Sequence, residues 1–212
     1  MRDPEIRAAL TGLIMQNLRE PDTLLLEEFG LCQHAARVDI AVVNGILHGY
    51  EIKSTVDKLD RLQNQQIIYN RIFDRVTIVA DETHVSRIMD ETPTWWGVIK
   101  ARVWGKRIRF KVLREPNDNK MIDPAAIVQL LWRDEAIALA KVCGLDRGIL
   151  TKPRSVVWKV LANSIPISEL SRHIRLAIKR RFSSEASCRQ ESNGGLFLRH
   201  ANLKGARGVQ SD

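Results

Sequence analysis

Apolar side chains recur at helical spacing near the start of the chain and in short strand-like runs after it. Ile6, Leu10 and Ile14 lie three to four residues apart, which predicts a helix over residues 4–19. The Asn44-Gly45 pair between two apolar runs is a strong hairpin signal. We expect strands at 24–29, 38–43, 46–54 and 76–80, and helices at 57–73 and 83–89.

A second β unit and a helical region follow. Residues 97–104 and 107–113 flank Gly105, and the second run alternates apolar with basic residues, as a strand with two unlike faces does. The polar stretch 115–120 indicates a linker. Periodicity then predicts helices at 124–142, 153–162 and 168–181. We therefore divide the chain into a domain at 1–115, a basic helical region at 116–182 and a disordered tail at 183–212, which is rich in Ser, Gly, Asn and Arg.

Composition fits an ordinary globular protein. The chain has 212 residues, of which 44% are hydrophobic, enough to bury a core. No apolar run approaches the roughly 20 residues that a membrane-spanning helix needs, and the N-terminus lacks a secretion signal. We expect a cytoplasmic protein without a membrane partner. The three cysteines, Cys32, Cys143 and Cys188, form no CxxC pair, which argues against a disulfide framework and a zinc knuckle.

Charge is distributed unevenly along the chain. Residues 1–92 carry 10 Lys/Arg and 15 Asp/Glu, a net of −5, whereas residues 93–212 carry 23 and 10, a net of +13. A basic half indicates a polyanionic partner, with nucleic acid first, although a merely solvated basic surface is the alternative. We expect the contacts to come from two groups of basic residues: Arg107, Arg109 and Lys111, and Lys152 and Arg154.

Three ionisable residues interrupt two otherwise apolar strands. They are Asp39, Glu51 and Lys53, and the last two share one face of a strand because they are two residues apart. Charges are rarely placed in such strands unless they are paired or bind something. Carboxylates can hold Mg²⁺, and a neighbouring lysine can stabilise developing negative charge, which suits phosphodiester hydrolysis. A structural salt bridge is the alternative for Glu51 and Lys53 alone.

The wider pattern resembles the PD-(D/E)XK nuclease superfamily. Asp39 is followed, after eleven residues, by Glu51-Ile52-Lys53, and Val38 stands where the superfamily name has proline. The order expected for residues 4–80 matches the superfamily's α-β-β-β-α-β core. The resemblance implies an α/β, restriction-endonuclease-like fold, here with an additional β-hairpin and a C-terminal helical region. It also implies Asp39 and Glu51 as metal ligands and Lys53 as the catalytic lysine.

Two further matches extend the resemblance. The superfamily often supplies another acidic ligand before the Asp strand, which favours Glu28, with Glu27 as the second choice. Many members carry Gln-xxx-Tyr on the helix after the lysine strand, and here Gln65 and Tyr69 share a helix face; a solvated helix face is the alternative. The chain also resembles small bacterial proteins that share the Arg-Val-Asp-Ile-Ala-Val, Gly-Tyr-Glu-Ile-Lys-Ser and Leu-Trp-Arg-Asp-Glu-Ala segments, and that resemblance names no substrate.

The hairpin raises a question of register. A two-residue turn at Asn44-Gly45 would pair Asp39 with Tyr50, and Glu51 would face the opposite side of the sheet. A shared metal site therefore requires an odd loop or a bulge. We expect a three-residue loop, Val43-Asn44-Gly45, with Gly45 in the left-handed conformation.

These patterns lead to one principal hypothesis and two alternatives. The first is a Mg²⁺-dependent nuclease (with Mn²⁺ as a second option) that acts on nucleic acid, DNA being favoured over RNA. The second is a DNA- or partner-binding protein on the same fold with little or no catalysis. The third is a protein without a nucleic-acid partner, in which the charges form a structural cluster.

Overall fold

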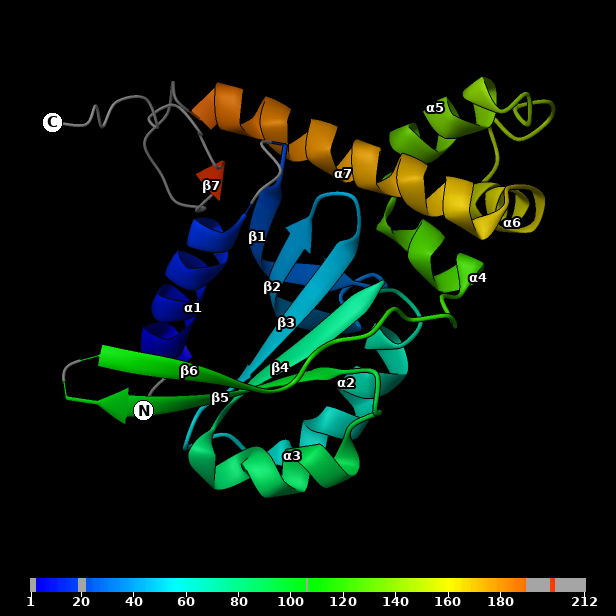
Figure 1. Ribbon diagram of the computed structural model, residues 1–212. Helices are drawn as coiled ribbons and strands as arrows, with labels where there is room; N and C mark the ends of the chain where they lie inside the picture. Colours follow the sequence, from blue (N-terminus) through cyan, green and yellow to red (C-terminus); the bar gives the residue numbers. More distant parts are fainter. Residues whose placement is uncertain (1–2, 19–21, 106, 190–198, 201–212) are drawn as a thin grey trace, which may run out of the picture.

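The computed structural model describes residues 3–18, 22–105, 107–189 and 199–200. Its first part has the expected α-β-β-β-α-β order (Figure 1). These elements are α1 (Asp3–Asn17), β1 (Leu24–Leu31), β2 (Ala36–Val43), β3 (Leu47–Lys53), a 3₁₀ turn η1 (Leu59–Arg61) with α2 (Leu62–Tyr69), and β4 (Arg75–Asp81).

The second part adds a hairpin and a group of helices. A 3₁₀ turn η2 (Glu82–His84) and α3 (Val85–Glu91) precede β5 (Gly97–Trp104) and β6 (Arg107–Arg114), which form the additional β-hairpin that was expected. The helices are α4 (Pro124–Ile127) with the 3₁₀ turn η3 (Val128–Leu130), α5 (Arg133–Val142), α6 (Arg154–Ser164) and α7 (Ile167–Arg189), and a short strand β7 (Arg199–His200) follows.

One mixed sheet organises the fold. Its strand order is β6-β5-β4-β3-β2-β1-β7, in which β1, β2 and β3 are antiparallel, β4 and β5 continue parallel to β3, and β6 returns antiparallel. Helix α1 covers one face through Ile6, Leu10 and Ile14, while α2 to α7 pack on the other face. The arrangement confirms the α/β class.

The hydrophobic core continues across the expected boundary at residues 115–116. A single buried cluster joins strand residues such as Val43 and Ile78 to Leu161 of α6 and Ile174 of α7. Asn119, from the expected linker, donates its amide to the backbone oxygens of Asn70 and Phe73. The helical region therefore packs directly on the sheet.

Three expected elements differ in the structure. The helix expected at 57–73 is confined to η1 and α2, because the Asp57 carboxylate accepts from the backbone and hydroxyl of Ser54 and holds the chain in a turn. The helix expected at 124–142 breaks at Leu131, where the backbone is extended and the Glu135 side chain caps the Trp132 N–H. The expectation of a disordered tail from residue 183 is wrong for 183–189, which continue α7, and for 199–200; residues 190–198 and 201–212 lie outside the described residues.

No helix in the described part of the chain is long and apolar enough to cross a membrane. Cys32 and Cys143 are free and half-buried.

Candidate functional site

The loop between β2 and β3 sets the register of the site. Val43 pairs with Leu47, which leaves the three-residue loop Asn44-Gly45-Ile46, closed by the Asn44 N–H donating to Ile46 O at 3.0 Å. The odd length was predicted correctly, but the loop is displaced by one residue and Gly45 does not have a positive φ. The pairing of Ile40 with Tyr50 then brings Asp39 to the level of Glu51 rather than Tyr50.

Followed away from the loop, the backbone pairing between β2 and β3 stops just before Asp39. Their pairing ends at Ile40 and Tyr50, and beyond it Asp39 Oδ2 accepts from the Ile52 N–H at 2.7 Å. Where the strands separate, the Asp39 carboxylate thus accepts the Ile52 N–H in place of a backbone carbonyl of β2. Burial raises the pKa of Asp39 to about 7, and repulsion from the Glu51 charge adds to the increase.

Glu51 is at the centre of a buried hydrogen-bond network. The residue is only 3% exposed, and its Oε1 accepts from Lys53 Nζ at 2.8 Å and from Gln65 Nε2 at 2.7 Å. Lys53 Nζ also donates to Gln65 Oε1 at 3.0 Å, so three side chains from β3 and α2 close a ring. Such a ring fixes the direction of the lysine ammonium group.

Tyr69, the last residue of α2, completes the network. Its hydroxyl lies 2.7 Å from Glu51 Oε2 and 2.8 Å from Arg37 O, and its one proton serves one of these acceptors at a time. Burial and the Glu51 charge raise the pKa of Tyr69 above its usual value, so the hydroxyl stays protonated. The predicted pairing of Gln65 with Tyr69 on one helix face is confirmed, since Gln65 Nε2 lies 3.3 Å from the hydroxyl. Tyr69 is fully buried, which excludes the alternative of a solvated helix face for this residue.

Arg7 of α1 is part of the site and was not among the candidates. Its Nη2 donates to Asp39 Oδ1 at 2.8 Å and its Nη1 to Asp39 O at 2.8 Å, and it pairs with Asp3 and Glu28 as well. The sequence offered only its position four residues after Asp3, which is typical of any surface ion pair on a helix. The guanidinium therefore neutralises part of the acidic cluster.

Glu28 occupies a different role from the one expected. It has a positive φ of 54°, and its carboxylate binds Arg7 Nη1 at 2.8 Å and Arg37 Nε at 2.5 Å. Across the residues that the structure describes, no group of three His, Cys, Asp or Glu side chains is arranged to hold a metal ion. The structure thus gives no support to Glu28 as a third ligand. Glu27 lies beside it on β1 and lines a neighbouring cavity.

One cavity of about 1010 Å³ brings these groups together. Its lining includes Arg7, Glu28, Asp39, Glu51, Lys53 and Gln65. Mg²⁺ commonly takes one or two carboxylates and keeps several waters, so Asp39 and Glu51 fit as a minimal donor pair. Burial first and then the Glu51 charge raise the pKa of Asp39, and a bound cation would offset the repulsion between the two carboxylates.

A comparison of the sequence with known protein families places the chain in one of them. Residues 1–197 match the family described as Bacteriophage P4 protein cII. The chain belongs to this cII family. Protein cII of Enterobacteria phage P4 is 24% identical over 202 residues, which cover 95% of this chain and 74% of that protein. A protein of unknown function from Silicibacter pomeroyi is 18% identical, covers 71% of this chain and 100% of its own, and has a TM-score of 0.43, too low to support an argument.

The cII match extends over the whole candidate site. It includes every residue of the network and the basic residues of β6 and α6. None of these comparisons bears on the resemblance to PD-(D/E)XK nucleases or to the group of small bacterial proteins, and both resemblances stay predictions.

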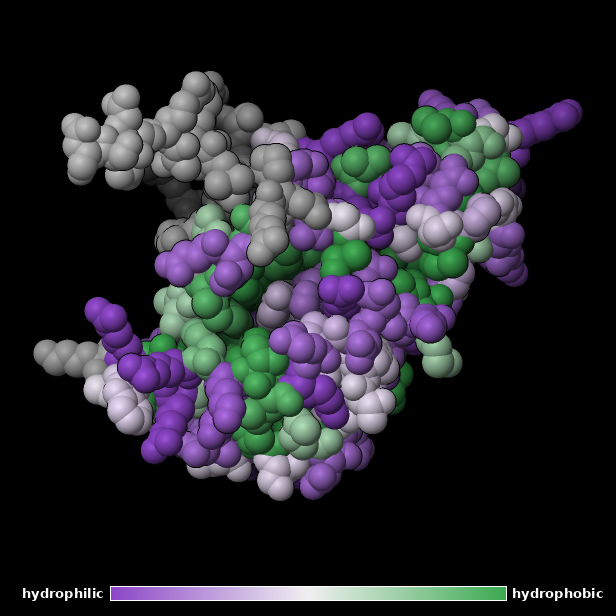
Figure 2. Space-filling model, in the orientation of Figure 1, coloured by the Kyte–Doolittle hydropathy of each residue, from purple (hydrophilic) through white to green (hydrophobic). Residues whose placement is uncertain are grey.

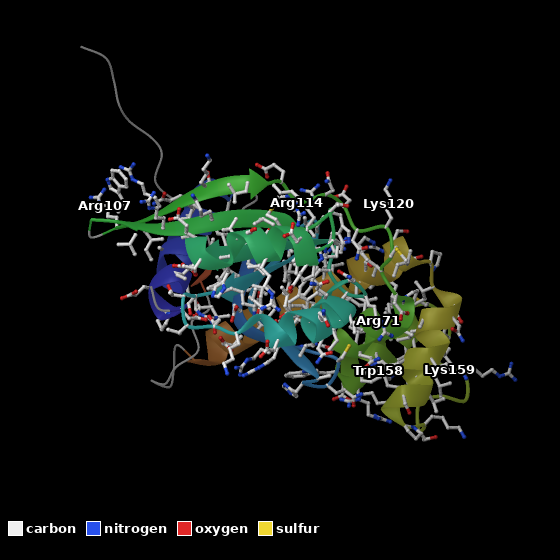
Figure 3. All side chains as sticks on the ribbon, turned by 90° about the horizontal axis from the view of Figure 1, so that it is seen from below. Arg71, Arg107, Arg114, Lys120, Trp158 and Lys159 are labelled. Carbon is white, nitrogen blue, oxygen red and sulfur yellow. The ribbon has the colours of Figure 1, made fainter. Side chains whose placement is uncertain are left out.

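The basic residues of this cII-family protein lie in two separate places. Arg107, Arg109 and Lys111 are exposed on β6, while Ile108 and Phe110 pack towards α1, so the predicted alternation is confirmed for residues 107–111. It does not extend to Val112, which is 47% exposed and pairs with Ile99 beside a register shift. Figure 2 shows hydrophilic residues gathered at the tip of this hairpin. Figure 3 shows Arg107 at one end of the molecule and Lys159 of α6 at the other. Lys152 and Arg154, at the start of α6, therefore do not join the β6 group in one patch.

Arg7 offers a first test of the site. In Arg7→Met, the carboxylates of Asp3, Glu28 and Asp39 lose a shared partner whose side chain is only 15% exposed. In urea unfolding, we expect the free energy of unfolding to fall by about 2 kcal/mol, between the values typical of exposed and buried ion pairs. Arg87→Met, which breaks an exposed pair with Glu91, is the matched control and should shift the urea midpoint little. Equal effects of the two changes would show that Arg7 does not hold the site together.

Proposed function

We propose that this cII-family protein is a nuclease that hydrolyses phosphodiester bonds in nucleic acid, DNA first, with Mg²⁺ or Mn²⁺ held by Asp39 and Glu51. The observation that carries the proposal is the convergence of Asp39, Glu51 and Lys53 in one cavity, with Gln65 joining them from α2. The α-β-β-β-α-β order and the spacing of these residues support a restriction-endonuclease-like core of the PD-(D/E)XK type.

Each residue has a distinct part in this chemistry. When bound, a divalent cation polarises the phosphoryl group and lowers the pKa of a coordinated water. Lys53, held by Glu51 and Gln65, presents a fixed positive charge that stabilises negative charge on the phosphoryl oxygens. Tyr69 orients Glu51 by donating to Oε2. Arg7 holds Asp39 by its Oδ1.

A binding protein without catalysis is the second candidate, and one observation favours it. The Glu51 oxygens already accept three hydrogen bonds, and both Asp39 oxygens are engaged by Arg7 and Ile52. A network that is satisfied in this way can also be a structural one. The two candidates differ in whether the site turns over substrate.

Cleavage assays separate the two candidates. Purified protein is incubated with labelled linear, nicked and branched DNA, and with RNA, in Mg²⁺, in Mn²⁺ and in EDTA. The proposal expects products only with a divalent cation. Binding without products under every condition would support the second candidate.

Binding to nucleic acid should depend steeply on salt. The first 92 residues are net negative, so we expect the basic residues after them to supply most of the attraction. If about five phosphates are contacted, log K should fall with log salt at a slope near −4 to −5. A truncation near residue 115 would cut through the hydrophobic core, so point substitutions are used to test this expectation. Changing Arg107, Arg109 and Lys111 together to Gln should make the slope shallower by about 3, at roughly 0.9 per contact.

The two basic groups can be compared in the same experiment. Lys152→Gln with Arg154→Gln tests the α6 group, which lies apart from β6. If neither variant changes the slope of log K against log salt, these residues form only a solvated basic surface.

A further inference from the structure

A second cavity adjoins the candidate catalytic one. It has a volume of about 510 Å³, within the range of sites that hold small molecules. Glu28 and His34 line both cavities, so the two meet at the turn between β1 and β2. Its far wall comes from η3, the residues just before α5, the first residue of α6 and the C-terminal half of α7.

The shared wall is built from strained backbone. Cys32, Gln33 and His34 have φ values of 46°, 58° and 70°, a run of left-handed residues without glycine. Such conformations are costly and cluster at functional sites, where the surrounding structure holds them. Gly30 makes room for the wall, since a Cβ there would lie 2.9 Å from His34 Nδ1. The turn therefore holds the His34 ring at the junction of the two cavities.

An aromatic platform forms the opposite wall. Trp132 is 54% exposed, and the Arg181 guanidinium lies 4.3 Å from its ring centroid and 5.9 Å from that of Phe182. Arg181 is fixed in turn by Glu135 and by Leu130 O. A large ring held in this way by a cation offers a rigid surface for stacking.

Most charges of the second cavity are already paired, which leaves its apolar surface to a neutral ring. Arg181 is paired with Glu135, and Glu28 with Arg7 and Arg37. Arg154 donates to Gln33 Oε1 at 2.8 Å and stacks on Trp158. What remains is an aromatic surface beside the Arg154 guanidinium, with the side-chain amides of Gln33 and Gln129 along the wall. Gln33 Oε1 accepts from Arg154 and Gln129 Nε2 donates to Ala125 O, so contacts with the edge of a base would use Gln33 Nε2 and Gln129 Oε1.

We infer that this second cavity holds an unpaired nucleobase of the strand whose backbone crosses the Asp39–Glu51 site. The inference rests on the proposed function, because it takes the bound polymer to be nucleic acid. A base can stack on Trp132 only after it leaves a duplex, so the preferred ligand is a single strand or a frayed end.

Binding of full-length protein in EDTA tests the inference without any cleavage. Fluorescence anisotropy is measured with a labelled single-stranded oligodeoxynucleotide and with its duplex. Trp132→Ala should weaken single-strand binding about ten-fold, the typical loss of one base–aromatic stack, and change duplex binding by no more than about two-fold. Trp132→Phe, which keeps an aromatic face, should keep most of the single-strand preference. Circular dichroism checks that each variant is folded.

Trp104 provides a matched control. It is 58% exposed and also lies beneath an arginine, Arg109, at 5.0 Å, but it is on β5, outside the second cavity. Trp104→Ala should leave the ratio of single-strand to duplex affinity unchanged. A second arm moves one abasic site along the single strand. At one position it should weaken wild-type binding as much as Trp132→Ala does, with no further loss in the Trp132→Ala variant.

The outcomes separate this inference from the proposed function. Equal losses for single strand and duplex in Trp132→Ala, or no loss at all, would overturn the base-binding cavity and leave the nuclease proposal standing. A wild-type protein that binds no nucleic acid would overturn both. Base-dependent binding without cleavage in Mg²⁺ or Mn²⁺ would support base binding in the second cavity and overturn the proposed nuclease activity.

Discussion

Glu51→Gln is expected to eliminate metal-dependent cleavage while the protein stays folded. Glutamine keeps an oxygen that accepts from Lys53 and Gln65, as Glu51 Oε1 does now. Its new amide N–H can donate to the Tyr69 oxygen, and the Tyr69 proton can turn to Arg37 O, only 2.8 Å away. The hydrogen bonds can re-form, but the negative charge that attracts a cation and that compensates the buried Lys53 ammonium group is lost, so the variant should stay folded with a lower free energy of unfolding.

The loss of activity should be large. Outer partners of metal ligands typically cost 10–100-fold when changed, so removal of a proposed direct ligand should cost more than about 100-fold. Asp39→Asn should have the same effect on cleavage. The new amide N–H group must face either Arg7 or the Ile52 N–H, both of which are donors, so Asp39→Asn should lower the free energy of unfolding as well.

Asp60→Asn is the control for these changes. Asp60 is exposed and lines the same cavity, so the variant makes the same chemical change without touching the proposed donor pair. For all three variants, cleavage of labelled DNA is assayed and metal binding is measured by calorimetry. Wild-type cleavage rates in Asp39→Asn and Glu51→Gln would show that the active site lies elsewhere.

The placement of Asp39 and Glu51 could be predicted because strand geometry is strict. Side chains alternate along a strand, so a shared site required an odd loop, and the loop is odd. The pairing of Gln65 and Tyr69 followed from helical spacing in the same way. Local periodicity therefore fixed the relations between residues on the same element or on neighbouring strands of a hairpin.

Relations between distant elements could not be predicted in this way. Arg7 reaches Asp39 across 32 positions, and only the packing of α1 on the sheet brings them together. The positive φ of Glu28 turns its carboxylate towards Arg37 and Arg7, and no pattern of residue types announces that turn. The same limit applies to the basic residues, whose faces followed from alternation but whose separation at two ends of the molecule did not.

The break at Leu131 shows a different limit. Periodicity favoured one helix over 124–142, since apolar residues continue at helical spacing through the break. Tertiary packing decides otherwise: Leu130 and Leu131 are buried in the core, and Glu135 starts a new helix by capping the Trp132 N–H. This break also produces the exposed Trp132 on which the second cavity depends.

Lys53→Met is expected to separate metal binding from turnover. Methionine has a similar length without the charge, so the proposed donor pair stays in place while the ammonium group near the phosphoryl oxygens is lost. Removing one preorganised group that stabilises developing negative charge typically lowers kcat about 10²–10³-fold. Calorimetry with Mg²⁺ or Mn²⁺ should still detect binding, and single-turnover assays should show the slower chemical step.

The buried ion pair requires a second variant, because Lys53→Met also affects folding. Glu51 and Lys53 have side chains only 5% and 8% exposed, and removing one partner of such a pair typically costs about 3–5 kcal/mol. In the double variant Glu51→Gln with Lys53→Met, no uncompensated charge remains, so stability should recover while activity should not. Recovery of cleavage together with stability would mean that Lys53 is needed only for folding. Loss of metal binding in a folded Lys53→Met protein would contradict the separate roles of the lysine and the carboxylates.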